Sequence, residues 1–160
     1  MSDSGANRAR PALDGATVER LASVAVALGT GLVLAIAVYL EPSDVGHGTH
    51  MQLGLNQCSF LTYCGLPCPM CGATTSFAMM AALRPLTAIW NQPFASLLFG
   101  MTLGAFAISS AEVFQPKRRW KRILDRIEPI EHWLAMAFLG LMGASWAWKI
   151  ALMKGWITFG

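Results

Sequence analysis

Three long apolar stretches, almost free of charged side chains, constrain this chain more than any other feature of its sequence. They cover about residues 21–40, 94–112 and 132–152. A helix of about 20 residues is roughly 30 Å long, which matches the hydrocarbon core of a bilayer. Each stretch is therefore predicted to be a transmembrane helix. The third reaches residue 152 provided that the side chain of Lys149 snorkels to the headgroups.

A cleaved signal peptide is the alternative for the first stretch. Its apolar core would hold only about 7–15 residues and would end at a small-residue cleavage site. The stretch from Leu21 to Leu40 is longer, and it runs directly into Glu41 and Pro42. We therefore expect a retained membrane anchor.

Composition supports a membrane protein. Hydrophobic residues make up 54% of the chain and charged residues 13%, whereas soluble domains carry roughly 25% charged residues. Intrinsic disorder is excluded because it requires low hydrophobicity. The length suits a single membrane domain, residues 18–156, after a polar tail of residues 1–17 that we expect to be mobile.

A fourth uncharged stretch, from Phe60 to Leu83, is not expected to cross the membrane. Glycine and proline interrupt its first half, and an unpaired backbone group facing lipid costs several kcal/mol. Only Gly72 to Leu83 reads as continuous helix, and a dozen residues reach roughly 18 Å, which is too short to span. The Cys segment, residues 58–84, is therefore predicted to be a Cys-rich loop followed by a short re-entrant or interfacial helix. The fold class is an all-α membrane protein with three transmembrane helices and this half-helix.

The distribution of basic residues predicts the orientation. Arg8, Arg10 and Arg20 precede the first span. A second basic group separates the second and third spans: Lys117, Arg118, Arg119, Lys121, Arg122 and Arg126. With three spans both groups share one face, which the positive-inside rule makes cytoplasmic. We therefore expect a protein of the cytoplasmic (inner) membrane with its N-terminus inside, and its Cys segment and C-terminus on the outer face.

The basic segment 117–128 is predicted to form an amphipathic helix. Its apolar residues recur at helical spacing: Trp120, Ile123, Leu124 and Ile127. Such a helix can lie on an anionic membrane surface and bind lipids or a membrane-protein partner. A surface linker that only obeys the positive-inside rule is the alternative, and it is favoured. Because the basic residues already serve topology, we expect no nucleic-acid partner.

The only visible chemistry is a cluster of four cysteines: Cys58, Cys64, Cys68 and Cys71. These thiols can form structural disulfides outside the cytoplasm, in any of three pairings. They can instead hold a metal ion, with zinc as the candidate and His47 and His50 as weaker ligands. In a third interpretation the C-x-x-C pair, Cys68 and Cys71, is a redox dithiol, and the helix that begins after Cys71 favours its thiolate.

These alternatives stay open at this stage, with a structural role favoured. No phosphate-binding loop, H-E-x-x-H motif or nucleophile elbow is present, so the sequence favours a non-enzymatic protein. The first hypothesis is a membrane protein with a structural or metal-binding cap on its outer face. The second is a membrane thiol–disulfide oxidoreductase.

The run from Gly65 to Thr74, followed by an apolar helix and Trp90-Asn91-Gln92-Pro93, resembles a family of bacterial membrane proteins. This family is catalogued as domain of unknown function twenty-seven fifty-two, and its pattern is P-C-P-x-C-G-x-T-R followed by an Asn-Pro step. The resemblance covers about residues 58–110 and implies a small multi-pass bacterial membrane protein without an established activity. Its motif falls here on Pro67, Cys68, Cys71, Gly72, Thr74, Asn91 and Pro93. The chain departs from the pattern at Thr75, which replaces an arginine, and at Gln92, which is inserted.

Overall fold

The computed structural model describes residues 14–115 and 119–157, and every regular element in these ranges is helical. Three helices are long and apolar enough to cross a membrane: α1 (Gly15–Tyr39), α5 (Pro93–Phe114) and α7 (Glu131–Met153). The prediction of an all-α membrane protein with three spans is therefore confirmed. α1 begins earlier than the apolar stretch does, because the residues before it, such as Glu19 and Arg20, are good helix formers that extend the same hydrogen-bonded ladder.

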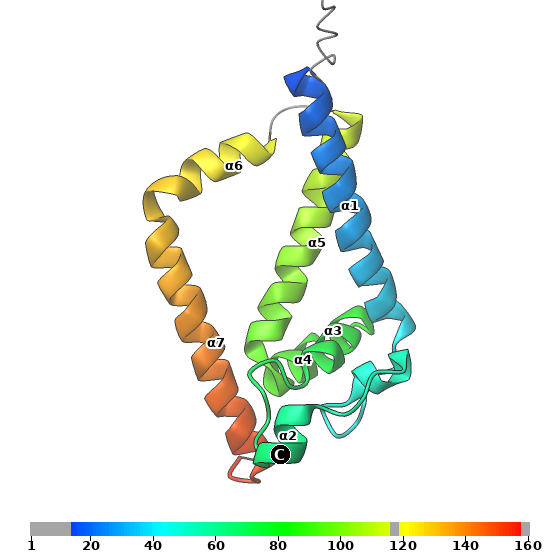
Figure 1. The fold of residues 1–160 in the computed structure, drawn as a ribbon, viewed down its shortest axis with the longest axis vertical. Coiled ribbons are helices and arrows are strands. Elements are labelled where there is room, and N and C mark those ends of the chain that lie inside the picture. The colour runs from blue at the N-terminus through cyan, green and yellow to red at the C-terminus, as the bar shows by residue number, and fades with distance from the viewer. Residues whose placement is uncertain (1–13, 116–118, 158–160) are drawn as a thin grey trace, which may run out of the picture.

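The chain runs back and forth between two ends of the bundle (Figure 1). α1 leads from one end to the other, α5 returns, and α7 runs back again. We call the end with the short helices that follow α1 the Cys end. The opposite end, which holds the start of α1 and α6 (Arg119–Ile127), is called the basic end.

The Cys end is built from four short elements. They are η1 (Thr49–Leu53), α2 (Ser59–Cys64), α3 (Ala73–Ala81) and α4 (Pro85–Asn91). None has more than nine residues, so none is long enough to cross a bilayer. The prediction of a short helix that does not span the membrane is therefore confirmed.

The bounds of the half-helix differ from the prediction. The expected single helix from Gly72 to Leu83 ends at Ala81, and a second helix, α4, follows it. Leu83 adopts a positive φ of 58°, which breaks the helix, and Pro85 starts the next one because it needs no N–H partner there. α2 was also not predicted. It ends at Cys64, and the next residue, Gly65, terminates the helix with a φ of 65°.

α1 and α5 form the main packed pair, while α7 diverges from α5 (Figure 1). Residues 131–141 of α7 are exposed. Near its other end α7 is tied to the Cys end: the Trp146 and Trp148 indoles donate to the carbonyls of Pro67 and Trp90, both at 2.7 Å. The rings of Trp90 and Trp148 also pack edge to face, with centroids 4.9 Å apart.

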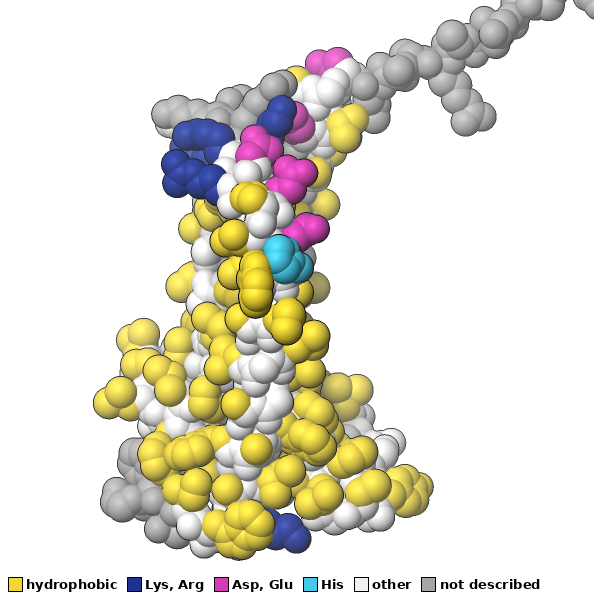
Figure 2. Space-filling model, turned by 90° about the vertical axis from the view of Figure 1, so that its left-hand side faces the viewer, with side chains coloured by type: hydrophobic (Ala, Val, Ile, Leu, Met, Phe, Trp, Pro, Cys, Tyr) yellow, Lys and Arg dark blue, Asp and Glu magenta, His cyan; other side chains and the backbone are white. Residues whose placement is uncertain are grey.

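The basic end gathers charged side chains, whereas hydrophobic side chains cover most of the surface below it (Figure 2). α6 runs across this end of the bundle (Figure 1), and it confirms the predicted amphipathic helix except at residues 117 and 118, which lie outside the described residues. Arg20 of α1 donates to the carbonyl of Val113 on α5 at 3.3 Å. The described parts of the two basic segments therefore share one end, as predicted. Of the predicted tail, residues 1–13 lie outside the described residues, while Gly15 to Thr17 belong to α1.

Candidate functional site

The C-x-x-C sequence forms a tight turn that leads into α3. The amide of Cys71 donates to the carbonyl of Cys68 at 2.9 Å, and the amide of Ala73 donates to that of Met70 at 3.0 Å. Gly72 then takes a φ of 87° before α3 begins. The turn therefore points the Cys71 side chain inward, where it is 7% exposed.

Three of the four cysteines lie near enough to influence one another's acidity. The thiols of Cys58 and Cys68 shift each other's pKa, and the charges of both groups act on Cys71. Cys64 is the exposed last residue of α2. The thiol that acts on the pKa of Cys68 is Cys58 rather than Cys71, the other cysteine of the C-x-x-C pair.

The thiols of this cluster differ in acidity. The backbone N–H of Leu61 lowers the pKa of Cys58; burial opposes this shift, and the Cys68 thiol and the Phe60 amide lower the pKa by smaller amounts. Burial raises the pKa of Cys68, and the neighbouring Cys58 thiol raises it further. Cys58 is thus the thiol of this pair that ionises more readily.

Burial raises the pKa of Cys71 to about 11, although the positive charge of Lys149 opposes this shift. The expectation that the start of α3 favours a Cys71 thiolate is therefore wrong. Burial destabilises the Cys71 thiolate by more than the start of α3 and the nearby Lys149 ammonium stabilise it. Cys71 is a neutral thiol at pH 7.

The predicted zinc ligands do not converge. Among residues 14–115 and 119–157, no group of three or more Cys, His, Asp or Glu side chains is arranged to hold a metal ion. The two histidine rings bond to backbone carbonyls instead, His47 to Val45 at 2.9 Å and His50 to Asn56 at 3.1 Å. The residues present therefore do not fit a zinc site in this arrangement, and the zinc hypothesis stays a prediction without geometric support.

The sequence interpretation missed the importance of Lys149. This side chain does not snorkel to the surface: it is 2% exposed and points into the Cys end. Its Nζ donates to the carbonyl of Gly46 at 2.8 Å and to Oδ1 of Asn91 at 2.6 Å. One signal was available, because an ionisable residue within a span usually faces the protein interior.

Asn91 connects Lys149 to α3. Its Nδ2 donates to Oγ of Ser76 at 2.8 Å and to the carbonyl of Gly72 at 3.3 Å, and Ser76 in turn donates to the carbonyl of Ala88. Asn91 is 7% exposed and Ser76 is fully buried. This lysine–asparagine network, made of Lys149, Asn91, Ser76, Gly46 and Gly72, joins α7, α3, α4 and the loop after α1.

Two glycines make the network possible. A Cβ on Gly72 would lie 2.5 Å from the carbonyl oxygen of Gly46 and 3.0 Å from Nζ of Lys149. A Cβ on Gly46 would lie 2.5 Å from Oδ1 of Asn91. Both residues also have a positive φ, 87° for Gly72 and 72° for Gly46, which disfavours any other residue. The glycine of the Cys motif is therefore required by close packing against the network.

The other motif residues have structural places. The carbonyl of the buried Pro67 accepts the Trp146 indole N–H, and Pro93 opens α5. Thr74 is half-buried beside apolar residues of α1 and lies outside the network. The motif is thus divided between the thiol cluster, the network and helix starts.

The two positions at which the chain departs from the resembled pattern are both buried. Thr75 is fully buried, and its hydroxyl pairs with that of Thr49 at 2.8 Å. Gln92 donates to the carbonyl of Pro69 at 2.7 Å and is also fully buried. Its Oε1 has no hydrogen-bond partner among the described residues. Gln92 therefore holds the C-x-x-C turn against the start of α5.

No protein-family model, no curated protein and no solved structure matches this chain. The site is therefore described from its own geometry. Its parts are the thiol cluster of Cys58, Cys68 and Cys71, and the lysine–asparagine network that lies behind Cys71.

Proposed function

We propose that this chain is a multi-pass protein of the bacterial cytoplasmic membrane whose Cys end is a structural cap on the outer face, closed by a disulfide between Cys58 and Cys68. The observation that carries the proposal is that these two thiols, on either side of α2, lie near enough to shift each other's pKa. Both cysteines are partly buried, with Cys58 just before α2 and Cys68 after it, so a bond between them would fasten the start of α2 to the turn before α3.

Orientation is part of the same proposal. The described parts of both basic segments lie at one end of the bundle (Figure 1), and basic ends are retained on the cytoplasmic side. The Cys end would then face the oxidising side of the membrane, where disulfides persist. The apolar and basic faces of α6 suit contact with anionic lipids at the cytoplasmic surface.

Closure of the disulfide needs a second disulfide as oxidant, supplied by an exchange partner. The Cys58 thiolate attacks one sulfur of the partner disulfide, forming a mixed disulfide and releasing one partner thiolate. Cys68, losing its proton to solvent, then attacks the Cys58 sulfur and releases the second partner thiol. Two protein thiols are oxidised and one partner disulfide is reduced to two thiols. Closing a loop of this size stabilises a fold by about 2–3 kcal/mol.

Thiol trapping followed by mass mapping tests the proposal. Membranes are treated with N-ethylmaleimide before any reductant is added, and the peptides are then identified. We expect one disulfide that joins the peptides of Cys58 and Cys68, lost in Cys58→Ser and Cys68→Ser and kept in Cys64→Ser. A bridge between Cys68 and Cys71, or four free thiols, would contradict it. Thiols that react only after a chelator is added would contradict it as well, and would instead support the metal-site hypothesis.

A thiol–disulfide oxidoreductase that uses the same pair is the second candidate. The unequal acidity of Cys58 and Cys68 favours it, because a partly exposed thiol with a lowered pKa beside a partner with a raised pKa suits thiol–disulfide exchange. A redox titration in glutathione buffers separates the candidates. A structural disulfide has a potential below about −300 mV, whereas an exchanging one lies higher.

A further inference from the structure

The positive charge of Lys149 has no counter-charge among the described residues. An ammonium carries three N–H donors, and Nζ has two acceptors there, the carbonyl of Gly46 and Oδ1 of Asn91. No described carboxylate forms an ion pair with it, and the neighbouring Cys71 thiol is neutral at pH 7. A buried cation held only by neutral oxygens is costly, so one N–H donor and one charge remain to be satisfied.

A cavity of about 500 Å³ has Lys149 in its wall, and this volume is within the range of small-molecule sites. Its polar lining side chains are Asp44, His47, Thr87, Asn91 and Lys149. Apolar side chains, including Met79 and Trp90, form other parts of the wall. The cavity therefore offers one buried cationic donor beside an apolar surface.

We propose that this cavity binds a small apolar acid, with its carboxylate on Lys149 and its hydrocarbon part against Met79 and Trp90. A carboxylate supplies one acceptor and one negative charge, which is what Lys149 lacks. A phosphate group carries about −1.5 to −2 charges at pH 7, and Asp44 on the same wall would oppose the excess. The site is independent of the Cys58–Cys68 disulfide, so either proposal can fail alone.

Binding of hexanoate to the full-length protein in lipid nanodiscs tests the proposal, with Trp fluorescence as the readout. We expect saturable binding that is about tenfold or more weaker in Lys149→Met, which keeps the apolar stem and removes the charge. Lys154→Met is the matched control because Lys154 is an exposed lysine just after α7; it should bind as the unsubstituted protein does. The neutral analogue 1-hexanol should bind at least about tenfold more weakly than hexanoate. Equal binding of the two, or equal affinity in Lys149→Met, would overturn the proposal.

A second measurement uses only the unsubstituted protein, in case Lys149→Met does not fold. A diazirine-bearing short carboxylic acid is photolysed in the nanodiscs, and the labelled peptides are mapped. We expect labels on the peptides of Met79 and Trp90, removed by hexanoate and not by 1-hexanol. Labels confined to other parts of the chain, or labels that hexanoate leaves in place, would overturn the proposal.

Discussion

The two ends of the bundle handle their polar side chains in different ways. At the Cys end, Lys149 and Asn91 are 2% and 7% exposed and bond to each other at 2.6 Å. At the basic end, Arg119 lies 3.8 Å from Glu112, and their side chains are 28% and 8% exposed. One end buries almost all of a lysine side chain, whereas the other keeps its arginine side chain partly in solvent.

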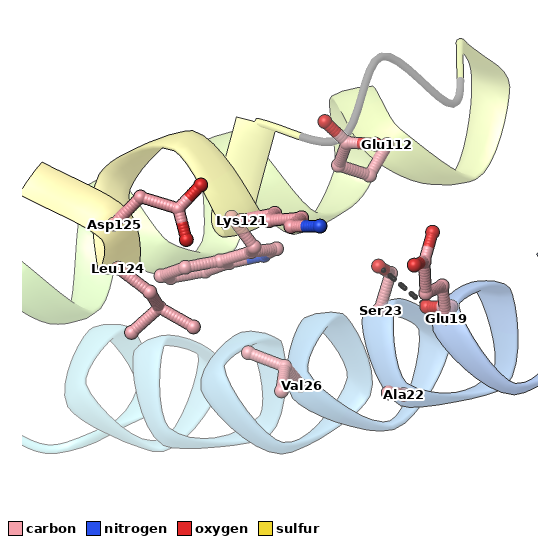
Figure 3. Close-up of a pocket in the computed structure, with 9 residues that line it drawn as sticks. Glu19, Ala22, Ser23, Val26, Glu112, Lys121, Leu124 and Asp125 are labelled. Carbon is pink, nitrogen blue, oxygen red and sulfur yellow. Dashed lines mark hydrogen bonds between the residues drawn. The ribbon is translucent and has the colours of Figure 1, made fainter. Parts of the chain in front are cut away.

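The basic end also has a hollow of its own. This hollow of about 410 Å³, somewhat smaller than the cavity of about 500 Å³ at the Cys end, lies between α1, α5 and α6. Val26 of α1 and Leu124 of α6 face each other across it, and Glu19, Glu112 and Asp125 stand around it (Figure 3). Ser23 bonds within its own helix, to the carbonyl of Glu19 at 3.0 Å (Figure 3).

The difference in burial between the two ends determines which substitutions each end can accept. At the Cys end the acceptors are backbone carbonyls and buried side chains in fixed places, so a small change in shape leaves a polar group unpaired. At the basic end water can replace a lost partner, so exposed charges there contribute little to stability. The predictions below test this contrast, from the largest expected effect to the smallest.

Gly72→Ala should cause the largest loss of stability. Its Cβ would lie 2.5 Å from the Gly46 carbonyl oxygen at a φ of 87°, so we expect a loss of about 3–5 kcal/mol in the free energy of unfolding. SDS-induced unfolding followed by Trp fluorescence measures it. Gly65→Ala is the control, because Gly65 has a φ of 65° and open space around its Cβ, and about 1–2 kcal/mol is expected. Equal losses would show that the network does not constrain Gly72.

Asn91→Leu should cost about 2–3 kcal/mol, because it removes a partner from Lys149 and from Ser76 while keeping the volume similar. The same unfolding assay applies. Gln52→Leu is the control: Gln52 is exposed, and its amide bonds to the backbone of Glu41, so a loss of less than about 1 kcal/mol is expected. If Asn91→Leu proves neutral, the buried network does not hold the Cys end.

Alkylation of the reduced protein should depend on pH in an order set by the thiol cluster. Only the thiolate reacts, and the pKa of Cys58 is lowered, that of Cys68 raised and that of Cys71 raised to about 11. As pH rises from 6 to 9, Cys58 should therefore be modified before Cys68, and Cys71 should stay protected. Iodoacetamide labelling with mass mapping measures the three rates. Early modification of Cys71 would mean that this thiol is not buried in the membrane-embedded protein.

Replacing exposed charges of α6 should have the smallest effect on stability. We expect Lys121→Gln with Arg126→Gln to change the free energy of unfolding by less than about 0.5 kcal/mol. The same double variant should bind vesicles rich in anionic lipid more weakly, since each basic residue near the surface contributes about 1 kcal/mol. A loss of stability comparable to that of Asn91→Leu would remove the contrast between the two ends.

Labelling of single cysteines from either side of the membrane sharpens the same contrast by fixing which end faces which compartment. In a background where the other cysteines are replaced by serine, Cys64 should react with an impermeant maleimide added outside. A cysteine placed at Lys121 should react only after the cells are opened. The reverse pattern would overturn the proposed orientation while leaving the fold intact.

Much of the fold follows from local sequence, and the site follows from it only in part. The spans were predictable because backbone groups in lipid must bond within their own helix. The break at Leu83 was not, since a positive φ at leucine is set by the packing of α3 against α4. The Cys motif did not indicate that Cys58, ten residues before Cys68, acts on the pKa of that thiol, because α2 separates the two in the sequence.

The sequence by itself determined the number of spans, the half-helix and the shared end of the basic segments. Each of these depends on the solvent that a stretch of chain must face, and a run of residues is enough to tell lipid from water. The tertiary structure alone decided that Lys149 turns inward to Asn91, and that Cys71 is a protonated thiol behind the Cys58–Cys68 pair. Both features depend on burial, and the position of Lys149 also depends on hydrogen-bond partners 58 or more residues away. A local sequence pattern contains neither kind of information.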